Sequence, residues 1–161
     1  MTNPHTMSKS TFPAPSQLMA HYPATPSEHC NRADNECGIR MSITLHKNKI
    51  SVSGSSRFRE THSHTDGIVH QPSAQALADW LSGTDRLGAP KEYKHPTGQW
   101  KKIDFITKNG IIYFAHPNRG GDGPGHIDVI SNGVIGSGFY DNKLIYFWEY
   151  IDGKYIANHK R

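Results

Sequence analysis

The chain has 161 residues, enough for one domain with a buried core and too few for two ordinary domains. Its formal net charge is +4, but Lys and Arg are scattered along the chain, so the charge does not predict a nucleic-acid-binding surface. No apolar run approaches the length of a transmembrane helix, and the N-terminus lacks the basic and apolar regions of a Sec signal peptide. We therefore expect one domain without membrane insertion, delivered by another route if it acts outside the cytoplasm.

The N-terminal segment is expected to lie outside the folded domain. Residues 1–16 contain three prolines and no hydrophobic periodicity, which is typical of a flexible arm. The remaining residues, 17–161, are expected to form a single domain. Within it, Gln17–Tyr22 predicts a short helical turn that ends before Pro23.

Two helices are predicted in the first half of the chain. Apolar residues recur at helical spacing from Cys37, so a helix is expected to begin there and to end between Lys47 and Lys49. Ser73 is a good N-cap for a second helix, which Gly83 ends. Both helices are expected to bury an apolar stripe.

The second half of the chain predicts an antiparallel sheet. Its apolar runs are short and rich in β-branched and aromatic residues, and turn sequences such as Asn132-Gly133 separate them. The expected strands cover residues 103–106, 110–114, 126–130 and 143–148. Helices followed by strands predict an α+β fold in which N-terminal helices pack on a C-terminal antiparallel sheet.

A cysteine at the start of a helix and a histidine at the start of a strand are the candidate catalytic residues. The unpaired N–H groups and the dipole of a first helical turn favour a thiolate at Cys37, and His126 would serve as its general base. Asp128 lies two residues on, on the same side of the strand, and is our first choice for the group that orients His126. Ser137 and Asp141 follow the next turn and are alternatives.

Two other kinds of chemistry, a disulfide and a metal site, have weaker support in the sequence. Cys37 would be unavailable as a nucleophile if it formed a disulfide with Cys30. His62, His64 and Asp66 offer metal-binding side chains, but no Cys-x-x-Cys pair or helical His-Glu-x-x-His pattern accompanies them. We therefore expect no metal and no cofactor. Gly125, next to His126, is expected to let a substrate approach the backbone.

The residues around these positions resemble a known family. The Asn-x-Cys-x-Ile-Arg-Met-Ser run at 35–42, the Gly-Ile-Ile-x-Phe run at 110–114 and the Gly-His-Ile-Asp run at 125–128 are similar to motifs of the type VI secretion amidase effectors of family four. Cys37 and His126 match that family's nucleophile and base. The family has an aspartate where this chain has Ser137, so the third role passes to Asp128 or Asp141, or is absent.

The resemblance implies a papain-like, NlpC-like fold and a peptidoglycan amidase that cuts between D-glutamate and meso-diaminopimelate in stem peptides. It also implies delivery by the type VI secretion apparatus into the periplasm of a rival cell, and a cognate immunity protein that blocks the cleft. Two other functions remain open: a non-catalytic module that binds the cell wall or accompanies a toxin, and a housekeeping or phage-derived wall hydrolase with the same chemistry.

Overall fold

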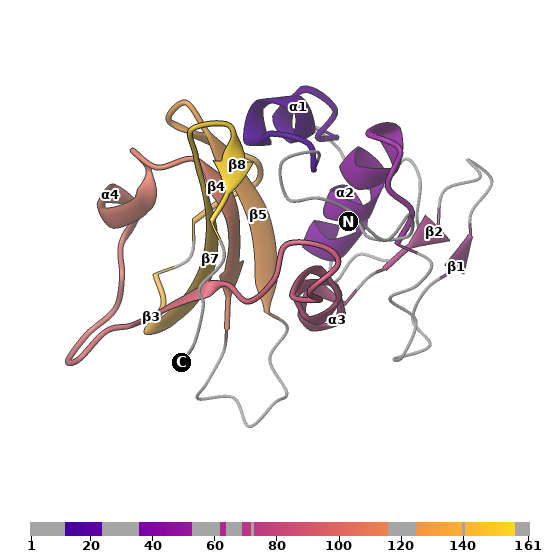
Figure 1. The fold of residues 1–161 in the computed structure, drawn as a ribbon. Helices are drawn as coiled ribbons and strands as arrows, with labels where there is room; N and C mark the ends of the chain where they lie inside the picture. The colour runs from indigo at the N-terminus through magenta and orange to yellow at the C-terminus, as the bar shows by residue number, and fades with distance from the viewer. Residues whose placement is uncertain are drawn as a thin grey trace.

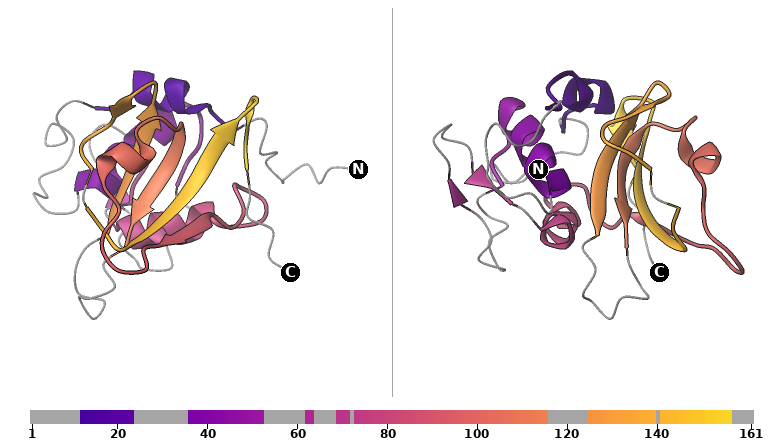
Figure 2. Two further views of the ribbon diagram at one scale, coloured as in Figure 1. Left: turned by 90° about the vertical axis from the view of Figure 1, so that its left-hand side faces the viewer. Right: turned by 180° about the vertical axis from the view of Figure 1, so that it is seen from behind.

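The computed structural model describes residues 12–23, 36–52, 62–63, 69–71, 73–115, 125–139 and 141–156. Helices α1, α2 and α3 lie against one face of an antiparallel sheet, and the short helix α4 lies on the other face (Figures 1 and 2). The elements in chain order are α1 (Pro15–Ala20), α2 (Glu36–Lys47), β1 (His62–Ser63), β2 (Val69–His70), α3 (Ala74–Leu81), β3 (Lys91–Lys94), α4 (Lys102–Phe105), β4 (Gly110–Phe114), β5 (His126–Ser131), β6 (Val134–Ile135), β7 (Leu144–Ile151) and β8 (Lys154–Tyr155).

The sheet has the strand order β3-β7-β4-β5-β6, with β8 paired to β7, and every pairing in it is antiparallel. The predicted α+β architecture is confirmed. The central strands β4 and β5 are buried along their whole length. Their register places Phe114 opposite His126 and Ile112 opposite Asp128, so the candidate site is built on a buried central strand pair of the sheet.

Helix α2 is buried on two sides, because it packs between the sheet and strand β2. Met41 and Leu45 belong to the main core cluster, whereas Ile39 and Ile43 form a separate buried pair. A buried hydroxyl links the helix to its surroundings: Ser42 donates to the carbonyl of Gly38 at 2.8 Å and accepts from the N–H of Gln71 at 2.9 Å.

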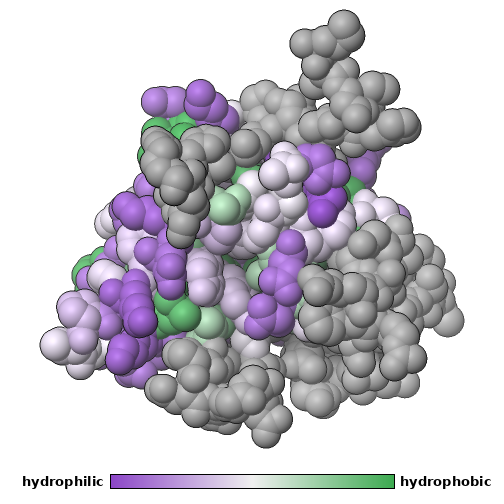
Figure 3. Space-filling model, turned by 60° about the horizontal axis from the view of Figure 1, so that its bottom comes forward, coloured by the Kyte–Doolittle hydropathy of each residue, from purple (hydrophilic) through white to green (hydrophobic). Residues whose placement is uncertain are grey.

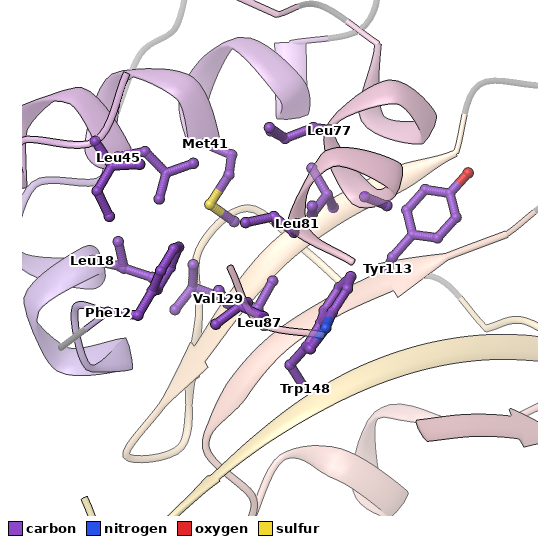
Figure 4. Close-up of a cluster of buried hydrophobic side chains, with 14 of the residues drawn as sticks. Phe12, Leu18, Met41, Leu45, Leu77, Leu81, Leu87, Tyr113, Val129 and Trp148 are labelled. Atoms are coloured by element: carbon purple, nitrogen blue, oxygen red, sulfur yellow. The ribbon is translucent and has the colours of Figure 1, made fainter. Parts of the chain in front are cut away.

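Helix α3 has the predicted N-cap. The Ser73 side chain accepts a hydrogen bond of 3.1 Å from the N–H of Ala76. The helix ends at Leu81, and the N–H of Gly83 then bonds to the carbonyl of Trp80 at 3.2 Å. The main core lies between the helices and the sheet (Figure 4), and its members include Leu18, Met41, Leu77, Leu81, Val129 and Trp148.

Residues 103–106, predicted as a strand, instead form the single turn of helix α4 and the residue after it. The carboxylate of Asp104 accepts from the N–H of Lys101 at 2.8 Å, which satisfies a donor at the start of a helical turn. Phe105 is buried against Tyr93, while Ile103 is 73% exposed. The capped helical turn forms in spite of the β-branched and aromatic residues in this segment.

Strand β3 is not among the strands predicted from the sequence. Lys91, Glu92 and Lys94 are exposed, as befits an edge strand that pairs with β7 through its backbone. Charged residues on an edge strand disfavour pairing with another chain. They also remove the hydrophobic alternation by which a strand is recognised in a sequence.

The N-terminal part of the domain begins earlier than predicted. Phe12 is 2% exposed and packs edge-on against Tyr155, with ring centroids 5.8 Å apart. The hydroxyl of Tyr155 donates to the carbonyl of Pro13 at 2.7 Å, and α1 begins at Pro15. Residues 12–16 therefore belong to the domain and not to an arm, because one aromatic ring among the prolines is enough to dock them. Residues 1–11 lie outside the described part.

Within the described ranges, no helix has the length and apolar character needed to cross a membrane.

Candidate active site

The candidate site is centred on a buried histidine–carboxylate pair at the start of β5. The Nε2 atom of His126 lies 2.8 Å from Oδ2 of Asp128. The side chain of Asp128 is fully buried, and that of His126 is 5% exposed. Residues two apart in a strand project to the same side, which is why this short spacing brings the ring and the carboxylate together.

The turn after β6 surrounds the carboxylate of Asp128 with hydrogen-bond donors. The N–H of Ser137 lies 2.9 Å from Oδ2, the N–H of Gly138 lies 3.1 Å from it, and the hydroxyl of Ser137 donates to it at 2.8 Å. On the other oxygen, Oδ1, the carboxylate accepts from the N–H of Val129 at 2.8 Å. A carboxylate with so many donors is a satisfied buried anion.

These contacts decide the charge of Asp128. Burial raises the pKa of its carboxyl, but the hydrogen bond and charge of His126, with the hydrogen bonds from Ser137, outweigh burial, and the pKa lies below its ordinary value. Asp128 is therefore an anion at neutral pH. An anion beside Nε2 favours a proton on that nitrogen and stabilises the imidazolium form of His126.

Glycine at position 136 permits the turn to approach the carboxylate. A Cβ atom there would lie 2.4 Å from Oδ1 of Asp128 and 2.8 Å from the ring of Tyr22. The Gly-Ser-Gly run at 136–138 is the sequence signal for this close turn, although the amide donors of Ser137 and Gly138 were not predicted from it.

Gly125 also has a packing role that the sequence did not indicate. A Cβ at this position would lie 2.3 Å from the hydroxyl oxygen of Tyr113. The space expected to admit a substrate is thus occupied by a tyrosine ring. The His126 ring itself packs against Phe114, with ring centroids 5.4 Å apart, and this contact limits its rotation.

Cys37 is the second residue of α2, so its backbone stands in the first turn of that helix as predicted. The hydroxyl of Thr44 donates to the carbonyl of Leu18, which ties the C-terminal half of α2 to α1. Helix α1 lies at the upper end of the molecule in Figure 1, and β5 begins at the lower end. Helix α2 also packs against β5. Its C-terminal half lies at the α1 end of the domain, so its first turn, with Cys37, lies at the opposite end, where β5 begins.

The remaining candidates have other partners or lie outside the description. Asp141 is an exposed residue that pairs with Lys101 at 3.3 Å. Cys30, His64 and Asp66 fall outside the described residues, as do the side chains of Cys37 and His62. Among the residues that are described, no group of three His, Cys, Asp or Glu side chains is placed to hold a metal ion.

A cavity of about 260 Å³ lies between α3 and the strands β4 and β7. Its lining includes Gln75, Asp79, Tyr113, Tyr146 and Trp148, but not His126 or Asp128. On the face seen in Figure 3, hydrophilic residues predominate among the coloured residues, and hydrophobic ones form only small patches.

Solved structures of amidase effectors share this fold. The effector Tae4 from Enterobacter cloacae aligns with a TM-score of 0.59 at 16% identity, over 92% of this chain and 99% of that chain. Tae4 from Salmonella typhimurium, in complex with the immunity protein Tai4 from Enterobacter cloacae, aligns with a TM-score of 0.54 at 22% identity, over 70% of this chain and 73% of that one. The fold is therefore the papain-like α+β fold of these effectors. No curated protein sequence matches the chain significantly.

The sequence itself gives the family. A model of the family "Type VI secretion system (T6SS), amidase effector protein 4" matches residues 33–148. This range contains Cys37, His126 and Asp128 and covers most of the chain. The chain belongs to this family and is an antibacterial peptidoglycan amidase of the type VI secretion system.

Proposed function

We propose that the chain cleaves peptidoglycan stem peptides by cysteine–histidine catalysis, with Cys37 as nucleophile, His126 as general base and acid, and Asp128 as the group that orients His126. The observation that carries the proposal is the buried 2.8 Å contact between Nε2 of His126 and Oδ2 of Asp128. A base held by an anion on one ring nitrogen is the arrangement that activates a neighbouring nucleophile.

The two ring nitrogens of His126 take different roles in this proposal. Nε2 is engaged by Asp128, so Nδ1 is the nitrogen that accepts the proton of the Cys37 thiol. The fixed charge on Asp128 stabilises the imidazolium that results, and the first turn of α2 stabilises the thiolate. A thiolate–imidazolium pair is thus favoured near neutral pH.

The reaction follows in two steps. The thiolate of Cys37 attacks the amide carbonyl, the backbone N–H of Cys37 contributes to an oxyanion hole, and the C–N bond breaks as His126 protonates the leaving amine. Water then attacks the thioester, with His126 as base, and releases the carboxylic acid and the thiol. The bond proposed is the one between D-glutamate and meso-diaminopimelate.

Delivery and inhibition complete the proposal. The effector acts in the periplasm of the target cell, where its substrate lies. Solved Tae4 structures contain the immunity protein Tai4, and we propose that an inhibitor of this kind binds the present chain over the end of the domain that holds His126. A producing cell requires such protection because its own wall contains the same bond.

Digestion of purified Gram-negative sacculi tests the proposal. The wild-type protein is expected to release fragments that end in D-glutamate and peptides that begin with diaminopimelate, both identified by mass spectrometry. Cys37→Ala and His126→Ala are expected to abolish release. His46→Ala, which changes an exposed histidine of α2, is the matched control and should retain activity. Activity retained by Cys37→Ala would refute the proposed nucleophile, and fragments cut elsewhere would refute the proposed bond.

A further inference from the structure

We propose that Ser137 is a positioning residue: its hydroxyl donates to the Asp128 carboxylate while its oxygen faces Nε2 of His126, and it thereby gives the proton on Nε2 a second acceptor that holds the imidazole ring in one orientation beside Asp128. This inference rests on the proposed role of His126. It adds a residue that acts through both members of the pair and touches no substrate.

Counting hydrogens carries the argument. The hydroxyl of Ser137 has one hydrogen and two polar neighbours, Oδ2 of Asp128 at 2.8 Å and Nε2 of His126 at 3.2 Å. An ionised carboxylate only accepts, so the hydrogen goes to the shorter contact with Asp128. The lone pairs of the serine oxygen are then left to face Nε2.

The same geometry disfavours the other tautomer of His126. With the proton on Nδ1, the lone pair of Nε2 would face the carboxylate oxygen at 2.8 Å. For Nε2 to accept the serine hydrogen instead, Asp128 would lose one of its donors. With the proton on Nε2, all of these contacts are satisfied together, and Nδ1 is left as the basic nitrogen.

Packing does not explain a serine at this position. Ser137 is exposed, unlike the carboxylate it contacts. The backbone N–H groups of Ser137 and Gly138 bind Asp128 whatever side chain stands at 137. Removal of the hydroxyl therefore leaves the turn and the carboxylate in place and changes the hydrogen bonding around Nε2.

Nitrogen-15 NMR of the histidine ring tests this inference without relying on catalysis. Measured in the Cys37→Ala background, neutral His126 is expected to carry its proton on Nε2 in nearly all molecules. Ser137→Ala and Ser137→Val, which remove that second acceptor, are expected to shift the Nε2 and Nε2–H resonances of His126 while the proton stays on Nε2. Ser137→Thr, which has the shape of valine and keeps the hydroxyl, is expected to restore the wild-type spectrum.

Kinetics on the otherwise wild-type enzyme provide the second readout. Ser137→Ala is expected to lower kcat about tenfold, the effect of losing one hydrogen bond to a charged group, with KM nearly unchanged. An unchanged Nε2–H resonance in both the alanine and the valine variant would overturn the inference, as would a threonine variant that behaves like valine. If Cys37 is not the nucleophile, the Cys37→Ala variant will still digest sacculi, and the NMR result will be unaffected.

Discussion

The carboxylate of Asp128 and the ring of His126 meet at 2.8 Å although they lie only two residues apart in one strand. A histidine and its orienting carboxylate usually need two segments to bring them together, whereas here one strand supplies both. The pair is therefore brought together by local geometry, and the neighbouring turn at 136–138 adds hydrogen bonds to it.

Replacing the Asp128 carboxylate by an amide should remove the charge that orients His126 and keep the packing of the side chain. Asp128→Asn keeps the shape of the side chain but offers Nε2 no anion, so we expect kcat to fall by about 10²- to 10⁴-fold, in line with the loss seen when the orienting aspartate of a catalytic triad is changed to asparagine. The measurement is the rate of fragment release from sacculi, with circular dichroism to confirm the fold. A variant with wild-type kcat would show that His126 needs no anion.

Acid should weaken the folded state through Asp128. Its pKa is lower in the folded than in the unfolded protein, so its contribution to stability is present above the unfolded pKa of about 3.9 and is lost as the pH falls through the folded pKa. Urea unfolding of the wild type and of Asp128→Asn should therefore differ most near neutral pH. The difference should shrink in strong acid, and a difference independent of pH would contradict the lowered pKa.

A methyl group at position 136 should disturb the turn that holds Asp128. Because the added Cβ would lie 2.4 Å from a carboxylate oxygen, Gly136→Ala is expected to cost about 1–3 kcal/mol in the free energy of unfolding and to reduce activity. Gly98→Ala is the control, since its Cβ would have no neighbour nearer than 3.6 Å. Equal stability of the two variants by urea titration would count against this close packing.

Asp141 should be dispensable for catalysis. It forms an exposed ion pair with Lys101, and such pairs contribute about 0–1 kcal/mol to stability. Asp141→Ala is therefore expected to keep the wild-type rate of fragment release and nearly the wild-type melting temperature. A large loss of rate would mean that Asp141, and not Asp128, takes the third role.

The core between the helices and the sheet should dominate stability. Leu77 is fully buried in the main cluster, so Leu77→Ala is expected to lower the free energy of unfolding by about 2–5 kcal/mol. Ile103→Ala, at a position that is 73% exposed, should change it by less than about 0.5 kcal/mol. Chemical denaturation of both variants measures the contrast.

The sequence predicted those elements whose signals are local. The α2 stripe and the Ser73 cap follow from helical spacing and from a single hydroxyl, and both were found. Strand β3 could not be found in this way, because charged side chains on a sheet edge erase the alternation on which recognition depends.

In the site, spacing predicted that His126 and Asp128 share a side of the strand. The donors from Ser137 and Gly138 depend on a turn that returns to the strand, and such a return is a property of the fold rather than of neighbouring residues. The packing of Gly125 against Tyr113 was missed for the same reason, since the contact joins two different strands.

The bond between Tyr155 and Pro13 spans 142 positions in the sequence. The segment around Phe12 can make these contacts only when β8, which carries Tyr155, is in place. During synthesis the segment around Phe12 stays undocked until β8 has left the ribosome, and a long-range contact of this kind slows folding in comparison with local contacts. Truncation within β8 should therefore release the N-terminal end of the domain as well as its own.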